Sequence, residues 1–267
     1  TARYILGNTF DYDPENPVAY EDLEEIDKWA LTRLNKLVKD CTKNYENYDF
    51  HLVYHDINQF CVNDMSTFYL DIIKDRLYTS LKDSKERRAA QTTMYTILDA
   101  LVKILAPMTV YTAEEIWKYM PHKKEEQVES VMLTYWPKSN SKYDNRELSE
   151  KWKKIIALKD IVAKDLEVER ANKTIGNSLD AKVTLYADGE EYSFLAENKH
   201  LLKEVFIVSG LDIEKNERKD AEKIGVKVEK ADGQKCERCW TYSTSVGENK
   251  EYPTLCHRCS EVMKKMK

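Results

Sequence analysis

Apolar residues recur three and four positions apart through roughly the first 120 residues, the spacing that gathers them on one face of a helix. One run extends from Leu23 to Cys41, and a second, from Phe50 to Ile73, allows a break near Asp64. The pattern predicts four helices joined by short connections, which pack as an antiparallel bundle. The predicted helical stretches are 20–46, 50–73, 83–105 and 112–121.

Local signals mark the ends of these helices. Two pairs with capping-box spacing predict helix starts and one proline predicts a stop: Asp83 with Glu86, Thr112 with Glu115, and Pro107. Residues 1–8 are typical of the last turns of an amphipathic helix. Because nothing initiates that helix, we expect a longer polypeptide to precede residue 1.

Beyond residue 121 the pattern changes. Residues 123–145 are mostly polar and contain a short extended segment at 130–137, which is expected to pack back on the bundle. A charged helix is predicted at 147–173, and residues 181–187 then alternate with the period of a half-buried strand. The remaining predicted elements of a small α/β piece are a helix at 190–203 and strands at 205–208 and 226–228.

The predicted fold class is mainly α: an antiparallel helical bundle (1–140), a small α/β domain (141–215) and a C-terminal tail with four cysteines (216–267). Only seven glycines and six prolines among 267 residues also favour helices over an all-β design. The mean hydropathy is −0.65, and no apolar run approaches the roughly 20 residues that span a bilayer. We expect a soluble, cytoplasmic protein without a membrane partner.

The net charge of −5 argues against indiscriminate binding to nucleic acid, because phosphate contacts need positive charge. It leaves room for a local basic patch. The segment from Lys235 to Lys267 carries seven Lys or Arg against four Glu, so it departs from the acidic average of the chain.

Four cysteines near the end of the chain carry the clearest chemistry. Cys236 and Cys239 form one Cys-x-x-Cys pair, and Cys256 and Cys259 form another. Two such pairs at this separation can bring four thiolates around one zinc ion, and four protein ligands leave no position for a water. The predicted site is therefore structural, and metal binding is expected to supply much of the folding free energy of this polar segment.

Disulfide bonds and redox chemistry are the alternative roles for these cysteines. Disulfides are typical of secreted proteins, and no secretory signal is found in this sequence. The remaining cysteines, Cys41 and Cys61, lie on apolar helical stripes like buried free thiols. Thioredoxin-like redox chemistry uses one pair in a βαβ unit, whereas two pairs share this segment. The pattern therefore favours zinc binding.

The segment Leu105–Trp117 resembles the anticodon-binding helical bundle of class I aminoacyl-tRNA synthetases. Further along, Ile175–Val183 and the two cysteine pairs are similar to the carboxy-terminal extension of bacterial isoleucyl-tRNA synthetases. That resemblance covers nearly the whole chain. It implies a monomeric ligase that joins isoleucine to its tRNA with ATP and Mg²⁺ and has a separate editing domain. The chain holds neither nucleotide-binding signature of that family, so it is expected to recognise tRNA and to have no catalytic residues.

Several side chains are candidates for RNA contact, each with an alternative. Trp240 follows a zinc ligand and can stack on an unpaired base or cover the metal cluster. Arg238 lies between two ligands and is expected to point outward, toward phosphate, base or solvent. Lys74 and Arg76 either contact RNA phosphates or form a salt-bridged helix face with Asp71 and Asp75.

The remaining candidates favour structural roles. Trp29 is either an exposed stacking platform or, as we expect, part of the packing between helices. His51 and His55 lack the third ligand of a metal site. A rival interpretation of the whole chain is a zinc-ribbon module that docks on another protein and never binds RNA, since interfaces also favour Trp and Arg.

Overall fold

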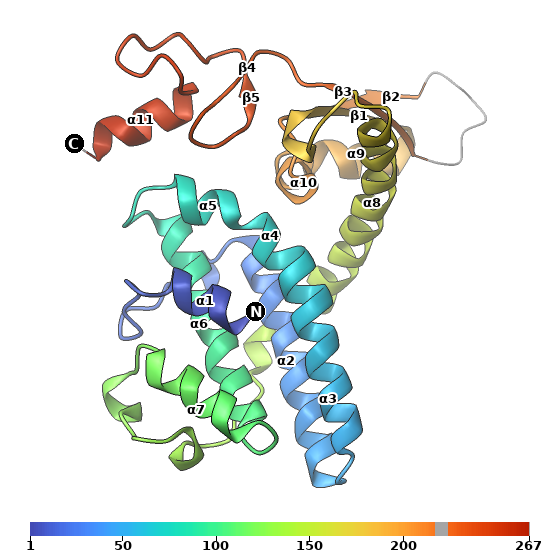
Figure 1. The fold of residues 1–267 in the computed structure, drawn as a ribbon. Helices are drawn as coiled ribbons and strands as arrows, with labels where there is room; N and C mark the ends of the chain where they lie inside the picture. Colours follow the sequence, from blue (N-terminus) through green and yellow to red (C-terminus); the bar gives the residue numbers. More distant parts are fainter. Residues whose placement is uncertain (217–223, 267) are drawn as a thin grey trace. The chain divides into compact units, whose positions relative to one another are not determined.

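A computed structural model describes residues 1–216 and 224–266 (Figure 1). The chain divides into two compact units, residues 1–149 and 150–267, and each is described by itself below. Within the described ranges, no helix has both the length and the apolar character that crossing a membrane requires.

The first unit is helical. Helix α2 packs against α3 and α6, and α6 in turn contacts α1, α5 and α7. The structure therefore confirms a helical bundle (Figure 1). Its elements are α1 (Ala2–Asn8), η1 (Tyr20–Asp22), α2 (Glu25–Glu46), α3 (Phe50–Gln59), the π-helix η2 (Phe60–Tyr69), α4 (Leu70–Ile72), α5 (Lys74–Thr79), α6 (Lys85–Leu105), α7 (Val110–Tyr119), and three short 3₁₀ turns, η3 (Lys124–Glu126), η4 (Val131–Leu133) and η5 (Ser141–Tyr143).

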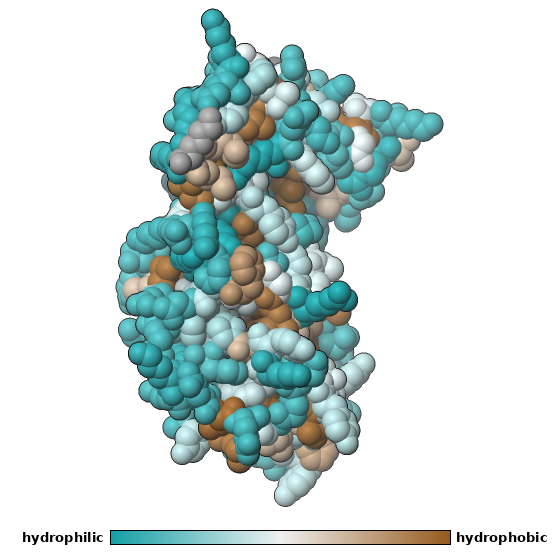
Figure 2. All heavy atoms as spheres, turned by 60° about the vertical axis from the view of Figure 1, so that its left-hand side comes forward, coloured by the Kyte–Doolittle hydropathy of each residue, from teal (hydrophilic) through white to brown (hydrophobic). Residues whose placement is uncertain are grey.

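The apolar stripes found in the sequence form the core of this unit. Leu31, Met65, Met94 and Ile97 have no more than 2% of their surface exposed. Hydrophilic residues dominate the face drawn in Figure 2, where hydrophobic side chains form separate small groups. Burial of the helical faces against one another is therefore the main source of stability for the bundle.

Three details of the bundle differ from what the sequence suggests. Helix α6 is capped by Ser84, whose Oγ accepts a hydrogen bond from the Arg87 amide at 3.4 Å, one residue later than predicted. Helix α7 begins after Thr109, so Thr112 lies inside it. The chain shows a π-helix at 60–69 in place of a break, because Asp64 pairs with Arg33 rather than capping a new helix.

The second unit joins a small sheet to a cysteine-rich ribbon. Its elements are most of α8 (Arg146–Ala171), η6 (Ser178–Asp180), β1 (Ala181–Ala187), α9 (Gly189–Glu197), α10 (Lys199–Phe206), β2 (Gly210–Lys215), β3 (Gly225–Lys230), β4 (Gln234–Lys235), β5 (Tyr242–Ser243) and α11 (His257–Lys265). Strand β1 lies between β2, to which it is parallel, and β3, to which it is antiparallel. Helices α9 and α10 connect β1 to β2 and contact the sheet.

The strand predicted at 181–187 is confirmed, and the one at 226–228 falls inside β3. The strand predicted at 205–208 is wrong. Val205 and Phe206 are the buried last residues of α10, and Ile207 caps the helix in a left-handed conformation. Strand β2 starts only at Gly210. A short apolar run does not by itself distinguish a strand from the buried end of a helix. The predicted separation of an α/β domain from a zinc-binding tail within this unit stays a prediction.

Candidate metal centre and nucleic-acid interface

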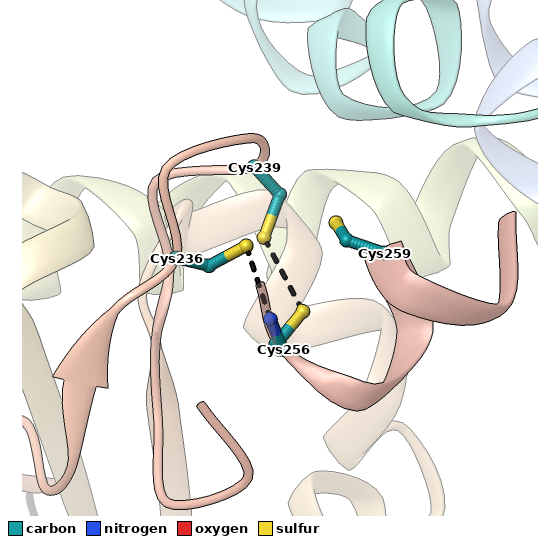
Figure 3. Close-up of side chains that lie close together, drawn as sticks. All are labelled: Cys236, Cys239, Cys256 and Cys259. Carbon is teal, nitrogen blue, oxygen red and sulfur yellow. Dashed lines mark hydrogen bonds between the residues drawn. The ribbon is translucent and has the colours of Figure 1, made fainter. Parts of the chain in front are cut away.

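The four cysteines come from two short elements that fix their backbone. Cys236 and Cys239 lie in the loop that connects β4 to β5, and these strands pair antiparallel. Cys256 is the residue before α11 and Cys259 lies in its first turn. Within each pair, the local turn presents both sulfurs to the same side (Figure 3).

The sulfur atoms converge on one point. All four lie within 4.8 Å of one another, and the Sγ atoms of Cys239 and Cys256 are 3.8 Å apart. Zinc–sulfur bonds of about 2.3 Å in a tetrahedron place neighbouring sulfurs about 3.8 Å apart. The residues therefore fit a zinc ion with four thiolate ligands. In the part of the chain that the structure describes, this is the group of side chains that could hold a metal.

The cluster is buried but has almost no apolar core behind it. The four cysteines are at most 7% exposed, and the hydrophobic side chains packed against them are those of Val246 and Leu255. The Cys256 amide donates to the Sγ of Cys236 at 3.3 Å, a bond that stabilises a thiolate. A closed shell of this kind is a structural site and not a catalytic one.

Mutual hydrogen bonding divides the protons unequally among these thiols. The Cys259 thiol donates to Cys239 and lowers the pKa of Cys239 to about 4. The same interaction, with burial, raises the pKa of Cys259, and burial raises the pKa of Cys256. Cys239 is thus favoured as a thiolate while the raised pKa values of Cys256 and Cys259 favour their protonated forms, and a divalent cation would stabilise these groups together as thiolates.

A glycine that the sequence analysis passed over shapes the ribbon. Gly233 has φ +86°, and a Cβ on it would lie 2.3 Å from the backbone of Ser243. No other residue fits this approach of the two arms of the hairpin. The dipeptide Asp232-Gly233 is a turn signal and could have been found from the sequence.

Arg238 does not simply point outward as predicted. It is half-buried, and its Nη1 donates to the Sγ of Cys259 at 3.8 Å. A guanidinium beside the cluster offsets part of the negative charge of the thiolates. Its role at the metal centre is thus supported by a contact, whereas contact with RNA stays a prediction.

Trp240 is the exposed aromatic side chain of the ribbon. Its side chain is 61% exposed, and the Nζ of Lys235 lies 5.5 Å from the ring centroid. Its backbone has φ +65°, in the left-handed region that favours glycine. The indole therefore does not cover the cluster in a buried position, the alternative considered from the sequence.

The two candidates in α5 differ from each other. Lys74 pairs with Asp71 at 2.6 Å, and both side chains are exposed, as expected of a salt-bridged helix face. Arg76 is only 14% exposed and donates two hydrogen bonds to Asp27, which is fully buried. The structure therefore supports the ion-pair alternative for Arg76, with Asp27 as the partner, because its guanidinium neutralises a buried carboxylate; contact of Arg76 with RNA phosphates stays a prediction.

The expectations for Trp29 and for the two cysteines of the bundle agree with the structure. Trp29 is 3% exposed and its ring centroid lies 4.8 Å from that of Phe68, so it packs between helices. Cys41 and Cys61 are free thiols, the first buried and the second partly buried, and burial raises the pKa of Cys41 to about 12. None of the six cysteines forms a disulfide.

Comparison with known protein families identifies two matching family models. Residues 27–185 match the model described as "Anticodon-binding domain of tRNA ligase", which covers more than half of the chain. The chain belongs to this anticodon-binding family. Residues 233–262 also match the model "Zinc finger found in FPG and IleRS", and this range contains all four cysteines. The cysteine cluster of this anticodon-binding protein is thus a zinc-finger site.

Similar curated proteins include the isoleucine–tRNA ligase of Caldicellulosiruptor saccharolyticus, 54% identical over 266 residues. The isoleucine–tRNA ligase of Caldanaerobacter subterraneus subsp. tengcongensis is 47% identical over 269 residues. These alignments cover 99% and 97% of this chain but 28% and 29% of the relatives. The chain thus spans less than a third of the length of these curated relatives.

Proposed function

We propose that this chain is the tRNA-recognising portion of an isoleucine–tRNA ligase. Its anticodon-binding family and the high identity to isoleucine–tRNA ligases along nearly its whole length support this proposal. The parent enzyme would attach isoleucine to its tRNA with ATP and Mg²⁺ in domains outside this chain. The partners would be the isoleucine tRNA and the remainder of a monomeric, cytoplasmic ligase.

In this proposal, the role of zinc is purely structural. When bound by Cys236, Cys239, Cys256 and Cys259, it neutralises the thiolates and fixes the two knuckles. The protein residues around it then hold Trp240 and Lys235 at the surface.

The observation that carries RNA recognition by the ribbon is the position of Trp240. This large aromatic residue has a left-handed backbone conformation that glycine adopts with less strain, and its side chain is exposed beside a zinc ligand. Unpaired bases of an anticodon loop stack on such rings, and Lys235 beside the ring adds a cation for the adjacent phosphate. Strain retained in an exposed aromatic residue favours a binding role over a packing role.

The test replaces Trp240 with glycine and, separately, with phenylalanine. Trp240→Gly relieves the backbone strain, so we expect unchanged zinc content and thermal stability, with tRNA affinity lower by about 5- to 150-fold, the worth of one stacked base at 1–3 kcal/mol. Trp240→Phe is the matched control and should keep much of the affinity. Filter binding of the chain to isoleucine tRNA measures both.

An unchanged affinity in Trp240→Gly would contradict stacking by this residue. In an intact ligase carrying the same change, activation of isoleucine with ATP should proceed normally, because that step belongs to other domains. A lost activation step would show that the ribbon supports the catalytic fold instead.

The rival function is a zinc-ribbon module that docks only on protein. The salt dependence of binding distinguishes it from RNA recognition. Counterion release makes RNA affinity fall steeply as salt rises, with a slope set by the number of phosphates neutralised. A flat response to salt, or no tRNA binding by the wild-type chain, would favour the rival.

A further inference from the structure

A cavity of about 420 Å³ opens in the second unit, and Trp240 is not among the residues that line it. It lies where the end of α8 and the turn after it meet β3 and the ribbon strand β5. Its lining residues are Arg170, Lys173, Thr174, Ile175, Gly176, Asp180, Lys230 and Tyr242.

The lining is cationic in a protein of net charge −5. Three of its side chains carry positive charge, and Asp180 is the carboxylate among them. That carboxylate is occupied, because its Oδ2 accepts hydrogen bonds from the amides of Gly176 at 2.9 Å and Asn177 at 3.0 Å. Asp180 thus holds the loop in shape, and the positive charge is left to face the cavity.

Two of the three cations have no anionic partner within residues 1–216 and 224–266. Arg170 pairs with Glu167 and also reaches the Oγ of Ser178 at 3.4 Å. Lys173 and Lys230 are exposed and form no ion pair in that part of the chain. Most other lysines of the sheet, such as Lys182 and Lys227, are paired with carboxylates.

Lys173 also occupies an unfavourable backbone position. The amide of Thr174 donates to the carbonyl of Glu169 and that of Lys173 donates to Arg170, the pattern that closes a helix with a left-handed residue. Lys173 is that residue, with φ +62°. Glycine or asparagine is usual there, so this lysine is placed at the mouth of the cavity against the backbone preference.

We propose that this cavity binds a phosphate group of the RNA backbone. A phosphate is a compact anion that several cations and a hydroxyl can surround, and Arg170 and Tyr242 supply directional donors. The cavity volume leaves room for the sugar of the attached nucleotide. The contact orients the RNA without reading its sequence, which separates it from the role of Trp240. This inference rests on the proposed function.

Lys173→Gly is the decisive variant, because glycine suits the left-handed backbone and misfolding cannot explain a loss of binding. We combine it with Lys230→Ala and measure affinity for isoleucine tRNA as a function of salt. The expected result is an affinity lower by roughly tenfold or more at low salt and a log–log salt slope smaller by about 0.7–0.9 for each lost contact. Thermal stability should be equal or higher.

The matched control is Lys203→Ala, which removes an exposed lysine of α10 in the same unit and should leave the slope unchanged. If the wild type binds tRNA and the double variant Lys173→Gly/Lys230→Ala shows the same affinity and salt slope, this inference is contradicted and the proposed function is not. No tRNA binding by the wild type contradicts the proposed function and this inference with it. If inorganic phosphate binds the wild type but not the double variant while tRNA binding is equal, the site serves a free phosphate and the RNA assignment is wrong.

Discussion

The helical bundle and the cysteine ribbon are stabilised by different physical means. In the bundle, long amphipathic helices bury residues such as Leu31 and Ile97 against one another, and even its buried charges are paired within it. The ribbon has two-residue strands, and the side chains packed on its four cysteines are those of Val246 and Leu255. A segment with so little apolar surface to bury depends on metal for its fold.

The two regions also differ in where they place charge and strain. The charges buried in the bundle, such as those of Asp27 and Arg76, are paired with one another. In the second unit, by contrast, Lys173 and Lys230 form no ion pair among the described residues, and Trp240 is exposed beside the cysteine cluster. A metal-held loop can carry a strained residue such as Trp240, because the coordination bonds and not the backbone preference determine its conformation.

Removing the metal should give the largest effect. Cys256→Ser is expected to release zinc and unfold the ribbon, since metal binding contributes on the order of 10 kcal/mol or more in isolated zinc peptides. The bundle should keep its helical circular dichroism. Metal analysis with circular dichroism measures both, and Cys41→Ala in the bundle is the control that keeps one zinc. Loss of the helical signal in Cys256→Ser would remove the distinction between the two regions.

Breaking the buried pair of the bundle should have the next largest effect. Arg76→Ala leaves the carboxylate of Asp27 buried and uncompensated, which destabilises by about 3–5 kcal/mol. Lys74→Ala is the matched control two residues away, and its exposed pair with Asp71 contributes about 0–1 kcal/mol. Urea denaturation gives both values. Equal small losses would mean that Arg76 is dispensable to the fold.

A smaller effect is expected from pH. Burial would raise the pKa of Asp11, but hydrogen bonds from Arg87 and Gln91 outweigh it, so the pKa lies below its usual value. A lowered carboxyl pKa adds stability that is complete above about pH 4 and is lost as pH falls through the folded-state pKa.

Urea denaturation of the bundle between pH 5 and 2 should therefore show a decline that Asp11→Asn reduces by about 1–2 kcal/mol. If the free energy of unfolding declines equally in wild type and Asp11→Asn, the pH dependence arises from other carboxylates. A separate measurement of released zinc monitors metal loss from the ribbon at low pH.

Periodicity predicted the bundle and the central strand because each buried face there is long enough to repeat several times. It failed at 205–208, where four apolar residues fit a strand and a helix end equally well. Cap positions near Ser84 and Thr109 shifted because several polar residues compete for the same helix start and packing decides among them.

The metal ligands could be predicted because spacing alone determines that chemistry. The roles of Arg76 and Arg238 could not, since their partners Asp27 and Cys259 lie far away in the sequence. The cationic cavity was equally hidden. It combines a helix end, a strand and the ribbon, and the strain at Lys173 is visible only in backbone angles.

One hydroxyl connects the ribbon to the sheet: Ser209 Oγ accepts from the Tyr242 amide at 2.7 Å and bonds to the carbonyl of Leu179. Tyr242 therefore stands in the cavity wall only while the ribbon is folded. A ligand that requires this wall binds the metal-loaded form better, and thermodynamic linkage then makes zinc bind more tightly by the same factor when the ligand is present. Zinc and the ligand of the cavity would then be cooperative effectors of each other, although none of the four cysteines lines the cavity.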